Sequence, residues 1–149
     1  MKIAVDIEIE KPKETIWSAI TDIENFSNMI SSIIDLKILN RPEDGIVGLK
    51  WKETRLMFGK EASEIMWITE SVENEYYCTR AESHGSVYIT KLSLSETARN
   101  TLLTMSFTGE AQALIVKIVS ACMGVFIKSS MKKLLCKDLE DIKKYVEQS

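Results

Sequence analysis

Residues 9–30 read IEKPKETIWSAITDIENFSNMI, and this stretch is the most informative part of the chain. Pro12 is well placed in the first turn of a helix, where its missing N–H costs no hydrogen bond. Ile16, Ile20 and Ile23 then recur at four- and three-residue spacing, which is typical of one face of a helix. The stretch therefore predicts a helix that begins near Pro12, followed by a second short helix.

The segment before it, residues 2–9, has the alternating pattern of a half-buried strand. Its inward face is predicted to consist of Ile3, Val5, Ile7 and Ile9. The chain therefore begins with a strand and turns directly into the helical stretch.

Six further segments have the composition of strands, separated by glycine-containing or polar turns. They are residues 33–40, 46–55, 60–70, 76–83, 86–95 and 101–109. Residues 60–70 carry apolar side chains on both faces, so their orientation stays open. Residues 110–148 contain no proline and repeat apolar residues at steps of three and four, which predicts one long C-terminal helix.

The pattern I-x-x-P-x-x-x-I-W-x-x-I-x-D-x-x-x-F resembles the opening of the polyketide cyclase/dehydrase and lipid-transport (SRPBCC) superfamily. The matching residues are Ile9, Pro12, Ile16, Trp17, Ile20, Asp22 and Phe26. Members include START-type lipid-transfer domains, pollen-allergen-like carriers and aromatic cyclases. The resemblance implies an α+β helix-grip fold: a curved seven-stranded antiparallel sheet around a long C-terminal helix, with two short helices after the first strand. The order of the predicted elements agrees over the whole chain.

Composition places few constraints on function beyond this. A chain of 149 residues with 45% apolar and 28% charged residues predicts a single globular domain, residues 1–149, and the net charge of −3 does not favour nucleic acid as a partner. Cys78, Cys122 and Cys136 are odd in number and widely spaced, which argues against a disulfide framework or a zinc site. The charged strand at the N-terminus is incompatible with a secretory signal, so we expect a cytoplasmic protein.

In helix-grip proteins the sheet and the long helix leave an apolar cavity, and its expected lining follows from the alternation of the strands. The candidate residues are Val47, Leu49, Trp51, Leu103, Met105 and Phe107 on the strands, with Leu114, Ile118 and Cys122 on the helix. The alternative is that these side chains fill a solid core, because rows of aliphatic side chains usually belong to protein cores.

Glu53 and Arg55 are the most pointed candidates, because alternation from Val47 puts both on the apolar face of their strand. They could pair with each other or orient the polar end of a ligand, since the arginine fork matches a carboxylate. Alternatively, the strand twists after Trp51 and both side chains reach water at the rim. The sequence leaves these alternatives open.

Other features give weaker signals. His84 is the sole histidine and is expected at a solvated hairpin tip. The lysines of the long helix, Lys128, Lys132, Lys133 and Lys137, either contact anionic lipid transiently or form an ordinary solvated face. No nucleotide-binding, P-loop, zinc-protease or nucleophile-elbow motif is present, and no metal or cofactor is expected.

The preferred interpretation is binding or transfer of a small hydrophobic ligand, such as a lipid, isoprenoid or polyketide-like compound. The first alternative is a cyclase/dehydratase-type enzyme that uses the same pocket, for which the sequence identifies no catalytic set. The second is a protein-interaction module resembling relatives that activate a chaperone.

Overall fold

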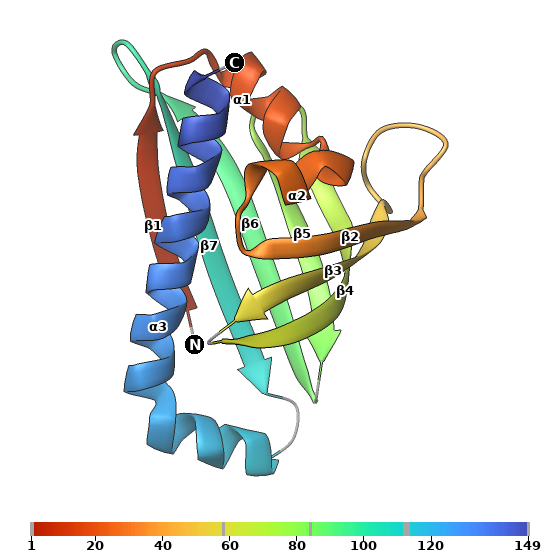
Figure 1. Ribbon diagram of the computed structural model, residues 1–149, viewed down its shortest axis with the longest axis vertical. Coiled ribbons are helices and arrows are strands. Elements are labelled where there is room, and N and C mark those ends of the chain that lie inside the picture. The colour runs from red at the N-terminus through yellow and green to blue at the C-terminus, as the bar shows by residue number, and fades with distance from the viewer. Residues whose placement is uncertain (1, 58, 84, 112–113, 149) are drawn as a thin grey trace.

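The computed structural model describes the backbone of residues 2–57, 59–83, 85–111 and 114–148, and the side chains of these residues except 57, 83, 110–111 and 114–128. A first strand is followed by three short helical segments, six strands and a long helix (Figure 1). The elements are β1 (Lys2–Ile9), α1 (Lys13–Ile20), η1 (Ile23–Asn25), α2 (Phe26–Met29), β2 (Ile33–Asn40), β3 (Lys50–Met57), β4 (Lys60–Val72), β5 (Tyr76–Ser83), β6 (Ser86–Glu96), β7 (Thr101–Ala111) and α3 (Leu114–Glu147).

The described strands form one antiparallel sheet in the order β1-β7-β6-β5-β4-β3-β2. Consecutive strands from β2 to β7 are neighbours, and β1 closes the series by pairing with β7. Figure 1 shows the sheet curving so that β2, β3 and β4 cross in front of the remaining strands, while α3 runs along β1 and β7. The structure confirms the predicted helix-grip architecture.

The predicted strand at residues 46–55 begins four residues later than expected, at Lys50. The preceding residues form a turn, in which the Leu49 N–H donates to the Ile46 carbonyl at 3.0 Å. Gly48 has a φ of 94°, which a residue with a side chain rarely adopts. Val47 therefore lies on this turn with 49% of its surface exposed, and its predicted place in the cavity wall is wrong.

Trp17 packs in the core between α1 and the sheet. Its indole meets Tyr77 of β5 edge to face, with ring centroids 6.0 Å apart. The Tyr77 hydroxyl in turn donates a 2.6 Å hydrogen bond to the Ile20 carbonyl at the end of α1. Burial raises the pKa of Tyr77, so this hydroxyl stays protonated and keeps donating. The contacts fix α1 on the concave side of the sheet.

The corner between α2 and β2 is tied to α3 by side-chain hydrogen bonds. The Ser31 N–H and hydroxyl both donate to Asp141 Oδ2, at 3.0 and 2.7 Å, and Asn25 Nδ2 donates to the Tyr145 hydroxyl at 2.7 Å. Burial by itself raises the pKa of Asp141, but the hydrogen bonds from Lys137 and Ser31 outweigh it and lower the pKa. These contacts fix the C-terminal part of α3 against the residues on either side of α2.

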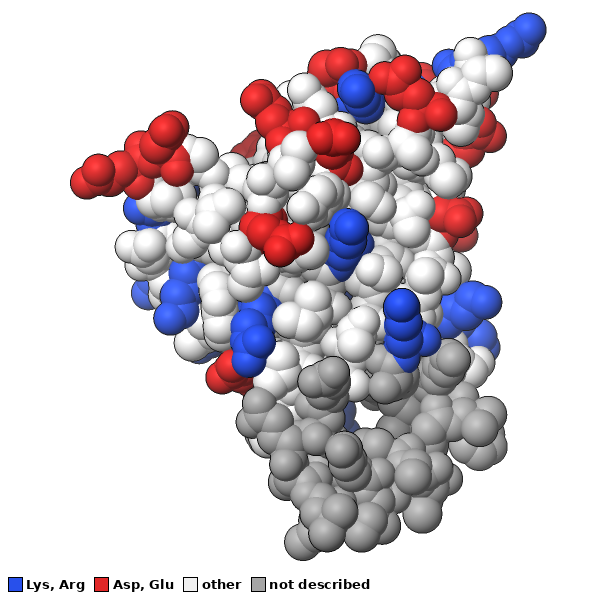
Figure 2. Space-filling view, turned by 180° about the vertical axis from the view of Figure 1, so that it is seen from behind, with Lys and Arg blue, Asp and Glu red and all other residues white. Residues whose placement is uncertain are grey.

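The convex face of the sheet carries both signs of charge. Figure 2, seen from behind, shows acidic and basic side chains interspersed among uncharged residues. None of the described helical segments has the length and apolar character needed to cross a membrane. His84 and Lys128 lie outside the residues whose side chains are described, so the expectations for them stay predictions.

All three cysteines are expected to be free thiols. Cys78 and Cys136 are unpaired in the described part of the chain, and Cys122 lies outside the described side chains. Titration of the denatured, non-reduced protein should therefore count three thiols. A count of one would reveal an intramolecular disulfide and contradict the expectation of a reducing environment.

Candidate functional site

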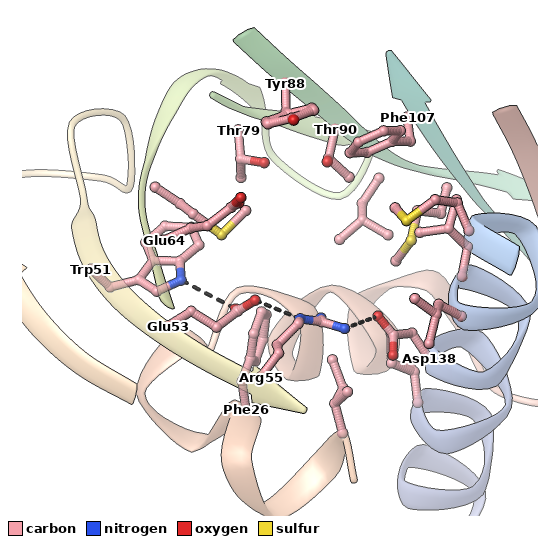
Figure 3. Close-up of a pocket in the computed structure, with 18 of the residues that line it drawn as sticks. Phe26, Trp51, Glu53, Arg55, Glu64, Thr79, Tyr88, Thr90, Phe107 and Asp138 are labelled. Carbon is pink, nitrogen blue, oxygen red and sulfur yellow. Dashed lines mark hydrogen bonds and ion pairs between the residues drawn. The ribbon is translucent and has the colours of Figure 1, made fainter. Parts of the chain in front are cut away.

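A cavity of about 260 Å³ lies between the concave face of the sheet, α2 and α3 (Figure 3). Its wall is mainly apolar, and one side carries charged groups. Among the described residues, the apolar and aromatic lining includes Phe26, Ile30, Trp51, Ala62, Met66, Tyr77, Tyr88, Leu92, Met105, Phe107, Met131, Leu134, Leu135 and Ile142. Because the residues that border this space are far apart in sequence, it exists only in the folded chain.

The structure settles the orientation of β4, which the sequence left open. Ala62, Glu64 and Met66 line the cavity. Ile65 lies between them in sequence, points outward and is 43% exposed. Trp67 also faces outward, where the Lys50 ammonium lies 5.7 Å from its ring centroid. A glutamate missed by sequence reasoning, Glu64, is thereby placed in the cavity wall.

Glu53 and Arg55 pair with each other, and a third charged residue joins them from α3. Arg55 Nε donates to Glu53 Oε2 at 2.7 Å, and Arg55 Nη1 lies 2.8 Å from Asp138 Oδ2. Ser32 completes the network, because its hydroxyl accepts from Arg55 Nη1 at 3.0 Å and donates to Asp138 Oδ1 at 3.3 Å. Figure 3 shows the part of this network formed by Glu53, Arg55 and Asp138 along one side of the cavity.

Burial and charge act in opposite directions on the members of this network. Burial by itself lowers the pKa of Arg55, but Glu53 and Asp138 outweigh it, so the pKa rises and the guanidinium stays charged. Burial raises the pKa of Asp138; Arg55 opposes the rise and Glu53 adds to it, with a net upward shift. Glu53 is held further by Trp51, whose Nε1 donates to Glu53 Oε1 at 3.4 Å.

Uncharged polar groups stand on the opposite wall. Thr79, Tyr88 and Thr90 come from β5 and β6, and Tyr88 stacks on Phe107 with ring centroids 5.5 Å apart. A Cβ at Gly109 would lie 3.2 Å from Cδ1 of the Tyr88 ring, so glycine at this position leaves room for the ring. Strict alternation along β6 would have predicted that Tyr88 and Thr90 face the cavity. No local signal marks Thr79 as a cavity residue.

The structure brings together some of the predicted site residues and separates others. Trp51, Glu53, Arg55, Met105 and Phe107 line the cavity. Val47 is exposed on its turn, as described above, and the side chains of Leu114, Ile118 and Cys122 lie outside the described residues.

Leu49 and Leu103 are buried but do not line the cavity, which corrects their predicted place in it. Leu103 is the third residue of β7, near the segment of chain that enters α1. There the Thr101 hydroxyl donates to the Lys11 carbonyl at 2.8 Å, and packed core occupies the space. Leu49 lies before the start of β3, beyond Trp51, where its carbonyl accepts from the Ile68 N–H at 3.0 Å.

Asp138 is the cavity residue that sequence reasoning missed most clearly. In the sequence it stands in a charged run with Lys137 and Glu140, which suggests a solvated helix face. In the structure its side chain is 4% exposed and bound to Arg55. The available signal was its position four residues before the core residue Ile142, because residues at this spacing lie on the same face of a helix. Within the described residues, no cluster of histidine, cysteine or acidic side chains is arranged to hold a metal ion.

Comparison with solved structures finds the same fold at low sequence identity. A protein from Thermus thermophilus superposes with a TM-score of 0.83 at 13% identity, covering 99% of this chain and 98% of that chain. A START superfamily protein from Mycobacterium smegmatis gives a TM-score of 0.82 at 20% identity, covering 99% and 97%. The Zhui aromatase/cyclase from Streptomyces sp. R1128 gives 0.76 at 10% identity, covering 99% and 94%.

No protein-family model matches the sequence, and comparison with curated proteins returns no match. The solved structures nevertheless match over nearly the full length of both chains. This chain therefore has the helix-grip fold that is shared by START superfamily proteins and aromatase/cyclases.

Proposed function

We propose that this protein binds a small hydrophobic molecule in the cavity between the sheet and α3, as a carrier or transfer protein. The observation that carries the proposal is the cavity itself, about 260 Å³ of space walled mainly by apolar and aromatic side chains. A solid core would fill this space, because protein interiors are normally close-packed. We assign this binding to residues 1–149 as a single domain. We also propose that the protein lies in the cytoplasm, a location that free thiols would support.

Desolvation supplies the driving force in this proposal. Apolar ligand surface leaves water and meets side chains such as Met105, Phe107 and Leu135, while a few polar groups orient the ligand. Drug-sized ligand pockets span about 300 to 1,000 Å³, so this cavity suits a compact ligand rather than a large lipid. The class we propose is a small apolar or isoprenoid-like molecule.

Dye binding tests the proposal. N-phenyl-1-naphthylamine, a neutral dye whose fluorescence rises in apolar surroundings, should bind with about one-to-one stoichiometry. Thr90→Phe should weaken this binding at least about tenfold, because the ring occupies cavity space next to Phe107, and the fold should survive since empty space accepts the added volume. Fluorescence titration and thermal unfolding measure the two effects.

Thr69→Phe is the matched control, because Thr69 is an exposed residue of β4 outside the cavity lining. It should leave dye affinity unchanged. Dye binding that is unaffected by Thr90→Phe, together with a clear loss of stability, would contradict the carrier proposal and point to a filled core. Native mass spectrometry of the purified protein, followed by organic extraction, would identify any retained ligand.

An enzyme of the cyclase/dehydratase type is the second candidate, and Asp138 is the observation that favours it. A cavity carboxyl with a raised pKa is suited to donate or accept a proton near neutral pH. The carrier is preferred because Asp138 and Glu53 are both engaged by Arg55, as in a structural ion-pair network. Chemical change of an extracted or added ligand during incubation would favour the enzyme.

A further inference from the structure

The residues that line the cavity become more exposed towards one end of it. On β3, Trp51 is 2% exposed, whereas 21% of the Arg55 side chain is exposed. Ala62, the register partner of Arg55 on β4, lines the cavity and is nevertheless an exposed residue. On α3, Ile142 is buried and Met131 is half-buried. The three elements together indicate a mouth between the Arg55 end of β3 and the helix.

An ion pair joins the two sides of this mouth. Arg55 Nη1 on β3 lies 2.8 Å from Asp138 Oδ2 on α3, and Figure 3 shows the arginine reaching across from the strand to the helix. Within the part of the chain whose side chains are described, it is the one salt bridge between β3 and α3. The helix packs mainly along β1 and β7, on the other side of the cavity. The ion pair therefore spans the gap that the backbone leaves between β3 and α3.

The two ends of the guanidinium have different partners. Arg55 Nε binds Glu53 of its own strand at 2.7 Å, whereas Nη1 binds Asp138 and donates to the Ser32 hydroxyl at 3.0 Å. The bonds of Nη1 can therefore break while Glu53 still compensates the charge of Arg55. Asp138 then keeps the hydrogen bond from the Ser32 hydroxyl, which is 3.3 Å long.

This division of partners makes opening of the ion pair different from loss of one of its residues. Deletion of Arg55 would leave two buried carboxylates without their cation, which is strongly destabilising. Separation of Arg55 from Asp138 leaves each charged group with a partner of its own. The bond between strand and helix can thus open transiently without unfolding the network.

We propose that Arg55 and Asp138 form a latch at the entrance of the cavity, which opens to admit or release a hydrophobic ligand and closes behind it. Ser32 steadies the closed form, because its hydroxyl bonds to both residues. Sites that close over a ligand commonly exchange it at the rate at which they open. The inference rests on the proposed function and adds the route by which the ligand enters and the step that limits its exchange.

Exchange kinetics of N-phenyl-1-naphthylamine test the latch. Asp138→Asn keeps the shape of the side chain but removes the charge that holds Arg55. The association and dissociation rates of the dye should both rise at least about tenfold, because entry and exit pass through the same open state and the open state no longer requires a buried ion pair to break. Stopped-flow fluorescence after mixing gives the first rate, and rapid dilution of the loaded protein gives the second.

Asp141→Asn is the matched control. It makes the same change three residues later on α3, where Asp141 binds the Ser31 hydroxyl at 2.7 Å outside the cavity lining, and it should leave both rates close to those of the unaltered protein. Ser32→Ala weakens the latch without altering either charge, and Ser32 does not line the cavity. It should raise both rates several-fold, and it keeps the test decisive if Asp138→Asn fails to fold.

The outcomes separate the latch from the proposed function. Faster dissociation with an unchanged association rate would show that Asp138 only contacts the dye, and it overturns the latch alone. Unchanged rates, or equal acceleration by Asp141→Asn through general loosening of α3, overturn it as well. Acceleration in both directions by Asp138→Asn and Ser32→Ala, but not by Asp141→Asn, supports the latch. Absence of dye binding in the folded, unaltered protein overturns the proposed function itself.

Discussion

Arg55→Met is expected to lower the free energy of unfolding by about 3 to 5 kcal/mol at pH 7, the usual effect of removing one partner from a buried ion pair. The cause is the uncompensated charge left behind. Glu53 is 7% exposed and Asp138 is 3% exposed, and both lose the guanidinium that lies within 2.8 Å of them. Urea unfolding measures the change, and circular dichroism checks that the variant folds.

The deficit of Arg55→Met should depend on pH. Burial already raises the pKa of Asp138 above its ordinary value, and loss of Arg55 removes the main opposing influence. A raised carboxyl pKa means that the folded state binds the proton more tightly than the unfolded state. The deficit should therefore be smallest at low pH and grow as pH rises through the raised pKa of Asp138.

Arg80→Met is the matched control. Arg80 also contacts a carboxylate at 2.7 Å, that of Glu82, but the two side chains are 37% and 52% exposed. The control should cost less than about 1 kcal/mol, because water solvates both partners. Equal losses in the two variants, or a deficit in Arg55→Met that does not vary with pH, would contradict a buried role for the network.

Trp17→Ala should also destabilise the protein by about 3 to 5 kcal/mol, as expected for a large-to-small change in a core. Trp17 is 9% exposed, and its indole packs edge to face on Tyr77, which in turn anchors the end of α1. Removing the indole leaves a void where α1 meets the sheet. Equilibrium denaturation monitored by far-UV circular dichroism measures the loss.

Trp67→Ala makes the same chemical change on the outer face of β4, where the ring is partly exposed beneath Lys50. Its cost should be about 1 kcal/mol, since the neighbouring space is open to water. A loss below about 1 kcal/mol for Trp17→Ala would rule out a central packing position for the indole. Trp17 does not line the cavity, so dye affinity should change little in any variant that remains folded.

The sequence predicted the order of elements because each depends on local periodicity. Alternation placed β1, β2 and β5 at their observed bounds, and the isoleucine spacing after Pro12 placed α1. The start of β3 was wrong, because alternation continued through a turn in which Gly48 has positive φ. A side-chain pattern cannot distinguish an extended residue from a glycine in the left-handed region.

The candidate site was predicted only where it follows from one strand. Trp51, Glu53 and Arg55 share a face of β3, and alternation found all three. The sequence did not decide whether Glu53 and Arg55 form an ion pair with each other or are solvated by water. The answer depended on Asp138, which lies 83 residues beyond Arg55 in the chain and approaches it because α3 packs across the sheet.

By itself, the sequence determined the strands, the helices and the apolar faces that must be buried, since these follow from spacing along a single segment. Tertiary structure alone decided which face of β4 turns inward. It also decided that Arg55 forms ion pairs with both Glu53 and Asp138. It also decided that Glu53 and Glu64 stand opposite each other. The physical reason is that strand register and helix docking bring together residues that are far apart in the chain. The net charge of the cavity wall depends on all of these residues at once.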